Sequence, residues 1–236
     1  MHPGAHAATN PDKPACVMAA SGEVVTYRAL DEAANQLARL LRDRGLGVGD
    51  NVAILMENNA AFLTVAWGPQ RSGLYYTAVN DRLTAPEVEQ IVNDCGARAL
   101  VASYDRRHVA AHLVGTTPAV HTRLMVGGTV DGFEPYEEAV GAMPAEPLPD
   151  AVEGLDLLYS SGTTGRPRGV RMPLAMNPVG TPTSATLILN RLYGLGADGV
   201  YLCPAPLHHA GPLRFTMAAQ RIGATAVVME RFDPGD

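Results

Sequence analysis

The chain has 236 residues, of which 47% are hydrophobic and 18% are charged, so its composition is that of a globular protein with a sizeable core. Eighteen basic residues stand against twenty-four acidic residues, and this formal charge of −6, with scattered arginines, argues against a nucleic-acid partner. No stretch has the length of a membrane span and no secretory signal opens the chain, so a cytoplasmic location is expected.

The first element is a helix predicted over residues 27–44. Apolar residues recur there at helical spacing behind Thr26, which is a good N-cap, and Gly45 follows as a stop signal. Residues 52–56 are then apolar without polar alternation, which indicates a buried strand.

Two more helices follow along the chain. The first is predicted over residues 60–70, with Asn58 or Asn59 as its cap. The second follows Thr84-Ala85-Pro86-Glu87, which has the pattern of a capping box with proline in the first turn, and it is expected to end at Gly96.

The alternation continues with a strand at 99–102, a helix at 106–114 and a strand at 123–126. Strand-then-helix order, with strands that lack polar alternation, is typical of a parallel sheet covered on both faces. The predicted fold class is therefore α/β, with mostly parallel sheets flanked by helices.

The regular pattern stops between residues 127 and 153, where glycine, proline and acidic residues accumulate. A soft boundary placed there divides the chain into two subdomains, residues 1–150 and residues 151–236. Residues 175–186 show no clear pattern. Order returns with a strand at 199–203, a helix at 212–221 and a strand at 224–229.

Cys16, Cys95 and Cys203 are far apart and show none of the paired spacing of zinc sites. We therefore expect reduced core thiols and no metal site.

The most informative segment is residues 160–169, which follow the apolar run 155–158. Small residues let backbone N–H groups turn toward an anion, hydroxyls add donors, and guanidinium groups neutralise charge, so the segment predicts a polyphosphate ligand. It is not the nucleotide-binding P-loop, because Gly162 and Gly165 are three apart and no lysine follows. A solvated surface loop is the alternative interpretation.

This segment closely resembles the phosphate-binding signature of the adenylate-forming enzymes, which comprise acyl-CoA synthetases, adenylation domains of peptide synthetases and luciferases. One position differs, because Arg168 stands where the family usually has lysine. Arginine keeps the positive charge, but its planar, forked guanidinium replaces the mobile ammonium of lysine. The resemblance implies that the phosphates of ATP are bound by Ser160, Ser161, Gly162, Thr163, Thr164, Gly165 and Arg168.

A second block, residues 206–212, resembles the family's segment near the acyl substrate. The resemblance implies that His209 acts as a catalytic residue, donating a hydrogen bond that holds the acyl carboxylate in line for attack. His208 and Gly211 are expected to contact the substrate beside it. The alternative for His209 is a core histidine satisfied by the backbone.

The remaining blocks extend the resemblance over nearly the whole chain. Residues 26–54 and 71–87 look like earlier family blocks, while 73–76 and 230–234 look most like bacterial fatty-acyl-CoA synthetases. Met172, Met176 and Met217 could coat an acyl tunnel or be ordinary core residues. The implied fold is a partial N-terminal domain of the acyl-CoA synthetase type.

The implied reaction has two steps: a fatty acid attacks ATP to give an acyl-adenylate, and coenzyme A then takes the acyl group, with Mg²⁺ assisting. Nothing in the chain resembles the family's adenine, magnesium and ribose blocks or its C-terminal domain. We therefore expect a fragment that is inactive alone and that self-associates through the truncated face, where strands and apolar surfaces would be left open. The alternatives are a carrier-protein-directed or aryl-acid adenylating enzyme, or a noncatalytic nucleotide-binding or acyl-binding scaffold.

Overall fold

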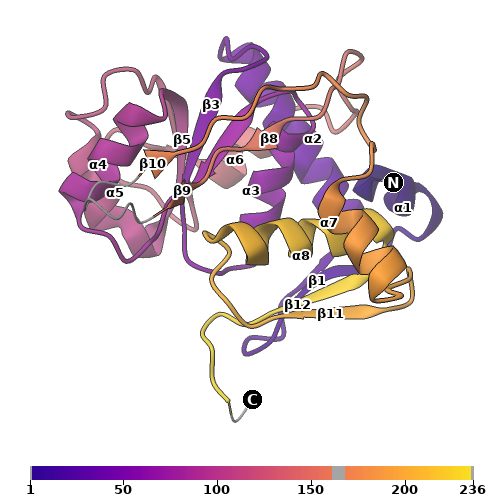
Figure 1. Ribbon diagram of the computed structural model, residues 1–236. Helices are drawn as coiled ribbons and strands as arrows, with labels where there is room; N and C mark the ends of the chain where they lie inside the picture. The colour runs from indigo at the N-terminus through magenta and orange to yellow at the C-terminus, as the bar shows by residue number, and fades with distance from the viewer. Residues whose placement is uncertain (1, 161–167, 235–236) are drawn as a thin grey trace.

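The computed structural model describes residues 2–160 and 168–234 (Figure 1). Among these residues, one sheet has six strands and an entirely parallel arrangement. Its strands are, in spatial order, β7 (Glu134–Pro135), β6 (Thr122–Val126), β5 (Ala97–Ser103), β3 (Asn51–Leu55), β4 (Tyr75–Ala78) and β8 (Leu155–Asp156). The predicted α/β class is confirmed.

The second sheet combines strands from the two ends of the chain. Its order is β11 (Val200–Cys203), β12 (Thr225–Val228), β1 (Pro14–Met18) and β2 (Val24–Thr26), and only β2 runs antiparallel to its neighbour. A short antiparallel hairpin joins β9 (Tyr159–Ser160) to β10 (Arg168–Gly169). Both larger sheets thus draw strands from each side of residue 150, and the division into 1–150 and 151–236 stays a prediction.

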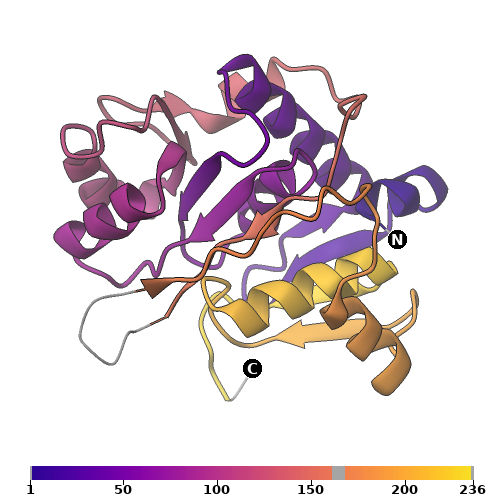
Figure 2. The ribbon, with the colours of Figure 1, turned by 45° about the horizontal axis from the view of Figure 1, so that its top comes forward.

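Three helices lie between the two larger sheets: α2 (Tyr27–Asp43), α3 (Ala61–Gln70) and α8 (Ala210–Ile222) (Figures 1 and 2). One hydrophobic cluster joins them to both sheets, because it contains Met18 of the smaller sheet, Ile54 of the larger sheet and Trp67 of α3. The other face of the larger sheet is covered by α4 (Ala85–Asp94) and α5 (Arg107–Leu113), whose apolar side chains pack in a second cluster.

The predicted helix signals act as expected at α2 and α4. The Thr26 hydroxyl accepts a hydrogen bond from the Ala29 N–H at 3.2 Å, and Gly45 lies just past the end of α2 with a φ of 81°. At α4, the Glu87 carboxylate accepts from the N–H and the hydroxyl of Thr84 at 2.8 and 2.6 Å. The capping box is therefore confirmed.

Two predicted helix starts are wrong. The N-cap of α3 is Ala60, without a side-chain hydrogen bond, so neither Asn58 nor Asn59 caps this helix. The helix predicted from residue 106 begins at Arg107, after the 3₁₀ turn η1 (Tyr104–Arg106). The Asn58 side-chain amide donates to Met229 O instead, and the Arg106 guanidinium donates to Asp81 O.

Several short elements escaped prediction. They include α1 (Pro3–Thr9), β1, β2, β4, β7, α6 (Tyr136–Gly141), α7 (Ser184–Leu187) and the π-helix η2 (Ile188–Leu192). The helices among them are short, and short helices depend on packing for stability. For example, α7 and η2 pack against α8 in a small cluster around Leu189 and Ile222.

The three cysteines are free and buried, as predicted for core thiols. Across residues 2–160 and 168–234, no group of three or more His, Cys, Asp or Glu side chains is placed to hold a metal ion. No helix in these same ranges combines the length and the apolar character that crossing a bilayer requires.

Candidate active site

Polar side chains gather where the central strands of the larger sheet end. Glu57 follows β3, Asp81 follows β4, and Ser103 is the last residue of β5. Ser103 Oγ donates a hydrogen bond to Glu57 Oε2 at 2.5 Å, so the ends of two neighbouring strands are linked. The carboxyl edge of parallel strands is the usual place for ligands in open α/β sheets.

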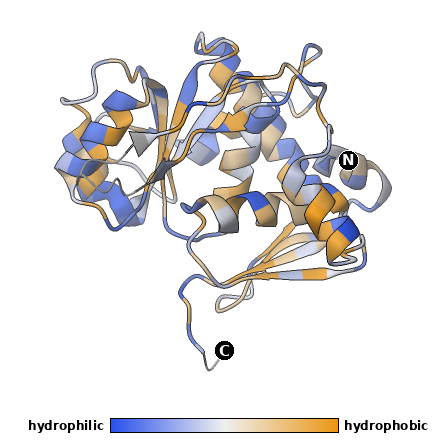
Figure 3. Ribbon diagram, viewed as in Figure 1, coloured by the Kyte–Doolittle hydropathy of each residue, from blue (hydrophilic) through white to orange (hydrophobic). Residues whose placement is uncertain are grey.

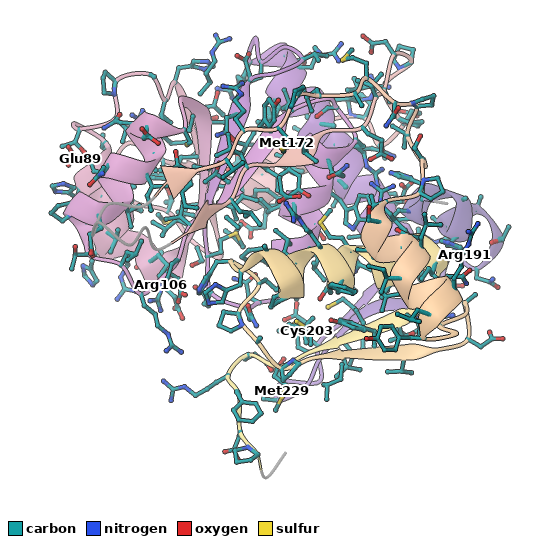
Figure 4. The ribbon with its side chains drawn as sticks, in the orientation of Figure 1. Glu89, Arg106, Met172, Arg191, Cys203 and Met229 are labelled. Atoms are coloured by element: carbon teal, nitrogen blue, oxygen red, sulfur yellow. The ribbon has the colours of Figure 1, made fainter. Side chains whose placement is uncertain are left out.

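His208 reaches this edge from the loop before α8. Its Nδ1 lies 3.3 Å from Asp81 Oδ1, and Arg106, labelled in Figure 4, places Nη1 3.6 Å from Asp81 Oδ2. Burial acts to raise the pKa of Asp81, but the hydrogen bond and charge of His208 and the charge of Arg106 hold it below its usual value. His208 is therefore a buried residue with a carboxylate partner.

His209 is the N-cap of α8, and it is exposed. Its ring centroid lies 4.3 Å from that of His208. Partial burial and the neighbouring His208 lower the pKa of His209, so it is neutral near pH 7 and can donate one ring N–H. Gly211, in the first turn of α8, is also exposed, and a Cβ there would meet no atom within 4 Å.

Asn58 positions this loop, a role that the sequence analysis missed. Its side-chain amide donates to Ala205 O at 3.2 Å and to Met229 O at 2.8 Å, and its Oδ1 accepts from the Leu207 N–H at 2.8 Å. Asn58 is buried, so three backbone groups depend on it. A polar residue shortly after a buried strand was the sequence signal, and a helix cap explains that signal equally well.

The phosphate signature begins and ends in the β9–β10 hairpin, where the backbones of Ser160 and Arg168 pair. The predicted ligands Ser161, Gly162, Thr163, Thr164 and Gly165 lie outside the described residues. The Tyr159 hydroxyl donates to Asp94 Oδ2 at 2.5 Å, which fixes the hairpin to α4. The hairpin and the N-terminal end of α8 lie on the same side of the molecule in both ribbon views (Figures 1 and 2).

A cavity of about 410 Å³ lies between α8, the edge strand β8 and residues 173–185. Its wall carries the ion pair between Arg214 Nη2 and Asp156 Oδ2, 2.7 Å apart. The hydrogen bond to Asp156 raises the pKa of Arg214, so the guanidinium is charged. Tyr76 lines the same cavity and donates to Gln70 Oε1 at 2.8 Å.

The cavity and the histidines are separate parts of the site. Arg214 lies in α8 just beyond the turn that begins at His209, but neither His208 nor His209 lines the cavity. Met217 does line it, whereas Met172 and Met176 are 58% and 51% exposed. The structure thus joins His208, His209 and Asp81 at the sheet edge and adds a charged cavity that sequence patterns did not indicate.

Comparison with known proteins identifies the family of the chain. The sequence profile of the AMP-binding enzyme family matches residues 4–236. A fatty acid–[acyl-carrier-protein] ligase, ScoC, from Streptomyces coeruleorubidus is 30% identical over 234 residues, which cover 96% of this chain and 42% of that protein. A 4-coumarate–CoA ligase 3 from Oryza sativa subsp. japonica is 32% identical, with 94% and 40% covered.

Among solved structures, the inhibitor-bound N-terminal domain of FACL13 from Mycobacterium tuberculosis superposes with a TM-score of 0.81 at 25% identity. The match covers 98% of this chain and 56% of that one. The chain spans 42% of the length of ScoC and 40% of the length of the rice 4-coumarate–CoA ligase 3.

Proposed function

The chain belongs to the AMP-binding enzyme family, and on that premise we propose that it forms part of an ATP-dependent acyl-CoA synthetase that activates a fatty acid through an acyl-adenylate. The observation that carries the proposal is the signature at residues 160–169, which begins and ends in a hairpin on the side where α8 presents His209. Hydroxyl, glycine and arginine residues suit a polyphosphate.

Within this proposal the signature residues bind the ATP phosphates and Arg168 neutralises the leaving pyrophosphate. His209 donates a hydrogen bond to the substrate carboxylate, because an exposed neutral imidazole at the N-terminal end of α8 has one ring N–H to donate. The family's Mg²⁺ and coenzyme A supply charge neutralisation and the acyl acceptor. The described residues include no group of three or more His, Cys, Asp or Glu side chains that could hold a metal ion.

The acceptor has a second candidate. The Streptomyces relative is named as a ligase for acyl-carrier protein, while the rice relative is a CoA ligase. The same adenylation chemistry would serve either acceptor, since the acceptor enters only after the acyl-adenylate has formed.

The first test is the binding of pyrophosphate and ATP, measured by isothermal titration calorimetry. Arg168→Ala should weaken binding roughly tenfold to a hundredfold, because hydrogen bonds to charged groups contribute about 1.5–3 kcal/mol. Arg171→Ala is the matched control, since Arg171 lies outside the signature, donates to Gly49 O and stacks on Tyr75. Equal binding by wild-type and Arg168→Ala protein would contradict the proposal.

We also propose that the chain associates with itself through the outer face of the smaller sheet. Strand pairing aligns four apolar side chains across that face: Leu202, Val227, Val17 and Val24. Leu202 is 55% exposed and Val24 is 50% exposed, and Figure 3 shows hydrophobic colour along these strands. An apolar row of this kind on an open sheet face favours association.

Light scattering across a wide concentration range tests this prediction. The wild-type chain should grow in mass with concentration, and Leu202→Glu should stay monomeric because a carboxylate would be buried in the contact. Leu192→Glu is the control, since Leu192 is 73% exposed but lies in η2, away from this face. A wild-type chain that stays monomeric throughout would refute the prediction.

A further inference from the structure

Residues 173–182, which we call the strap, form one wall of the cavity beside Arg214. The strap contains no helix or strand, and it is part of the coil that runs from β10 to α7 (Figures 1 and 2). Prolines at positions 173, 178 and 182 fix three of its backbone φ angles, so it is stiff for a coil segment. The position of the strap therefore sets how far this cavity is open.

Glu153, just before β8, holds the strap in place. Its N–H donates to Asn177 O at 2.9 Å, and its Oε1 accepts a hydrogen bond from the Gly180 N–H at 2.7 Å. The adjoining Val152 forms an isolated β-bridge with Pro178. One short stretch of backbone and one side chain thus carry most of the attachment of the strap to the body of the protein.

The chain is fixed again at Met172, directly before the strap. Its carbonyl accepts a hydrogen bond from the Tyr75 hydroxyl at 2.6 Å, and Figure 4 labels its side chain. Residues 173–176 lie between this attachment and Asn177. Their backbone must therefore bridge two fixed points, which restricts the conformations that it can adopt.

Met176 shows the effect of this restriction. Its φ is 50°, and within residues 2–160 and 168–234 it is the one residue other than glycine with a positive φ. That backbone conformation is uncommon for a side chain such as methionine, and it persists only where the surrounding structure imposes it. The side chain is exposed, so packing does little to offset the cost. Strain at Met176 therefore favours release of the strap, whereas the hydrogen bonds to Glu153 favour its closure.

We propose that the strap is a gate over the cavity beside Arg214, which opens when Asn177 and Gly180 leave Glu153 and which Met176 biases toward the open state. Few hydrogen bonds hold the closed state, and release lets Met176 return to an ordinary backbone conformation, so opening is local and does not require unfolding of the sheets. The gate needs neither ATP nor an acid substrate, and it stands or falls independently of the proposed function.

Amide hydrogen exchange measured by NMR tests the gate. The reporters are the amides of Glu153 and Gly180, which lose their acceptors when the strap opens and which do not adjoin residue 176. Met176→Asn should slow exchange at both amides by about threefold or more, because asparagine tolerates the left-handed conformation. Met176→Val should accelerate it by about fivefold or more, because a β-branched side chain fits that conformation poorly.

Met172 provides the matched control. It is an exposed methionine next to the strap, but its φ is not positive. Met172→Asn and Met172→Val should therefore each change exchange at the two reporters by less than about threefold, as for other surface substitutions.

The amide of Val101, in the buried centre of β5, reports global unfolding. In the wild-type chain the two reporters should exchange at least about a hundredfold faster than Val101. They should also respond much less than Val101 to low concentrations of urea, because local opening exposes little surface.

Chemical labelling tests access to the cavity itself. Met217 lines the cavity and is 4% exposed, so the thiol of Met217→Cys should react with iodoacetamide mainly when the strap is open. Labelling should be at least about fivefold faster when Met176→Val is added than when Met176→Asn is added. The chain without Met217→Cys corrects for its three buried cysteines.

Three results would each overturn the proposal. The first is equal exchange at Glu153 and Gly180 in the Met176→Asn and Met176→Val variants. The second is exchange at these amides as slow as at Val101. The third is a labelling rate of Met217→Cys that does not depend on residue 176.

Discussion

Replacing Arg221 by methionine is expected to lower the free energy of unfolding by about 3–5 kcal/mol, because it breaks a buried ion pair and leaves a carboxylate without its partner. Arg221 is 2% exposed, and its Nη1 and Nη2 lie 2.8 and 2.5 Å from the two carboxylate oxygens of Glu153. Its guanidinium also stacks on Trp67, with 4.9 Å between the guanidinium carbon and the ring centroid.

Urea unfolding followed by circular dichroism measures this effect. Circular dichroism is preferred to fluorescence because Trp67, the single tryptophan of the chain, contacts the substituted residue. Arg28→Met is the matched control, since its pair with Asp12 spans 3.4 Å between side chains that are 53% and 87% exposed. That control should cost less than about 1 kcal/mol.

A double variant separates charge from packing. Adding Glu153→Gln to Arg221→Met removes the unpaired charge, so part of the lost stability should return. The amide of Gln70 donates to Glu153 at 2.5 Å and can still find an acceptor on glutamine. If Arg221→Met costs no more than Arg28→Met, the ion pair between Arg221 in α8 and Glu153, just before β8, adds no more stability than an exposed pair.

Asn58→Ala is expected to cost about 2–4 kcal/mol, because it leaves the Leu207 N–H and the carbonyls of Ala205 and Met229 without their partner. These groups lie beside the loop that carries His208 and His209. We therefore expect faster amide hydrogen exchange at Leu207, by about tenfold or more, in addition to lower global stability.

Asn59→Ala is the control for this prediction. Asn59 is the next residue and donates only to Glu57, at 2.8 Å, so its loss should cost less than about 1 kcal/mol. Urea unfolding and hydrogen exchange of both variants provide the comparison. Equal losses in the two variants would show that Asn58 does not anchor the histidine loop.

Short sequence motifs predicted some features of the candidate site and missed others. The signature at residues 160–169 and the block at 206–212 were recognisable because each packs its chemistry into about ten consecutive residues. The contact between His208 and Asp81 was not recognisable from the sequence. It joins residues that come together only because the loop before α8 folds over the sheet edge. The charged cavity beside Arg214 escaped for the same reason.

Sequence alone was enough for the α/β class, the capping box before α4, the end of α2 at Gly45 and the family of the chain, because periodicity, caps and contiguous motifs act over a few residues. Only the tertiary structure decided that β1 pairs with β12, that Asn58 holds a loop 149 residues away, and that Glu153 neutralises Arg221. Those contacts depend on which buried groups meet when the sheets close over α2, α3 and α8, and no short window of sequence contains both partners.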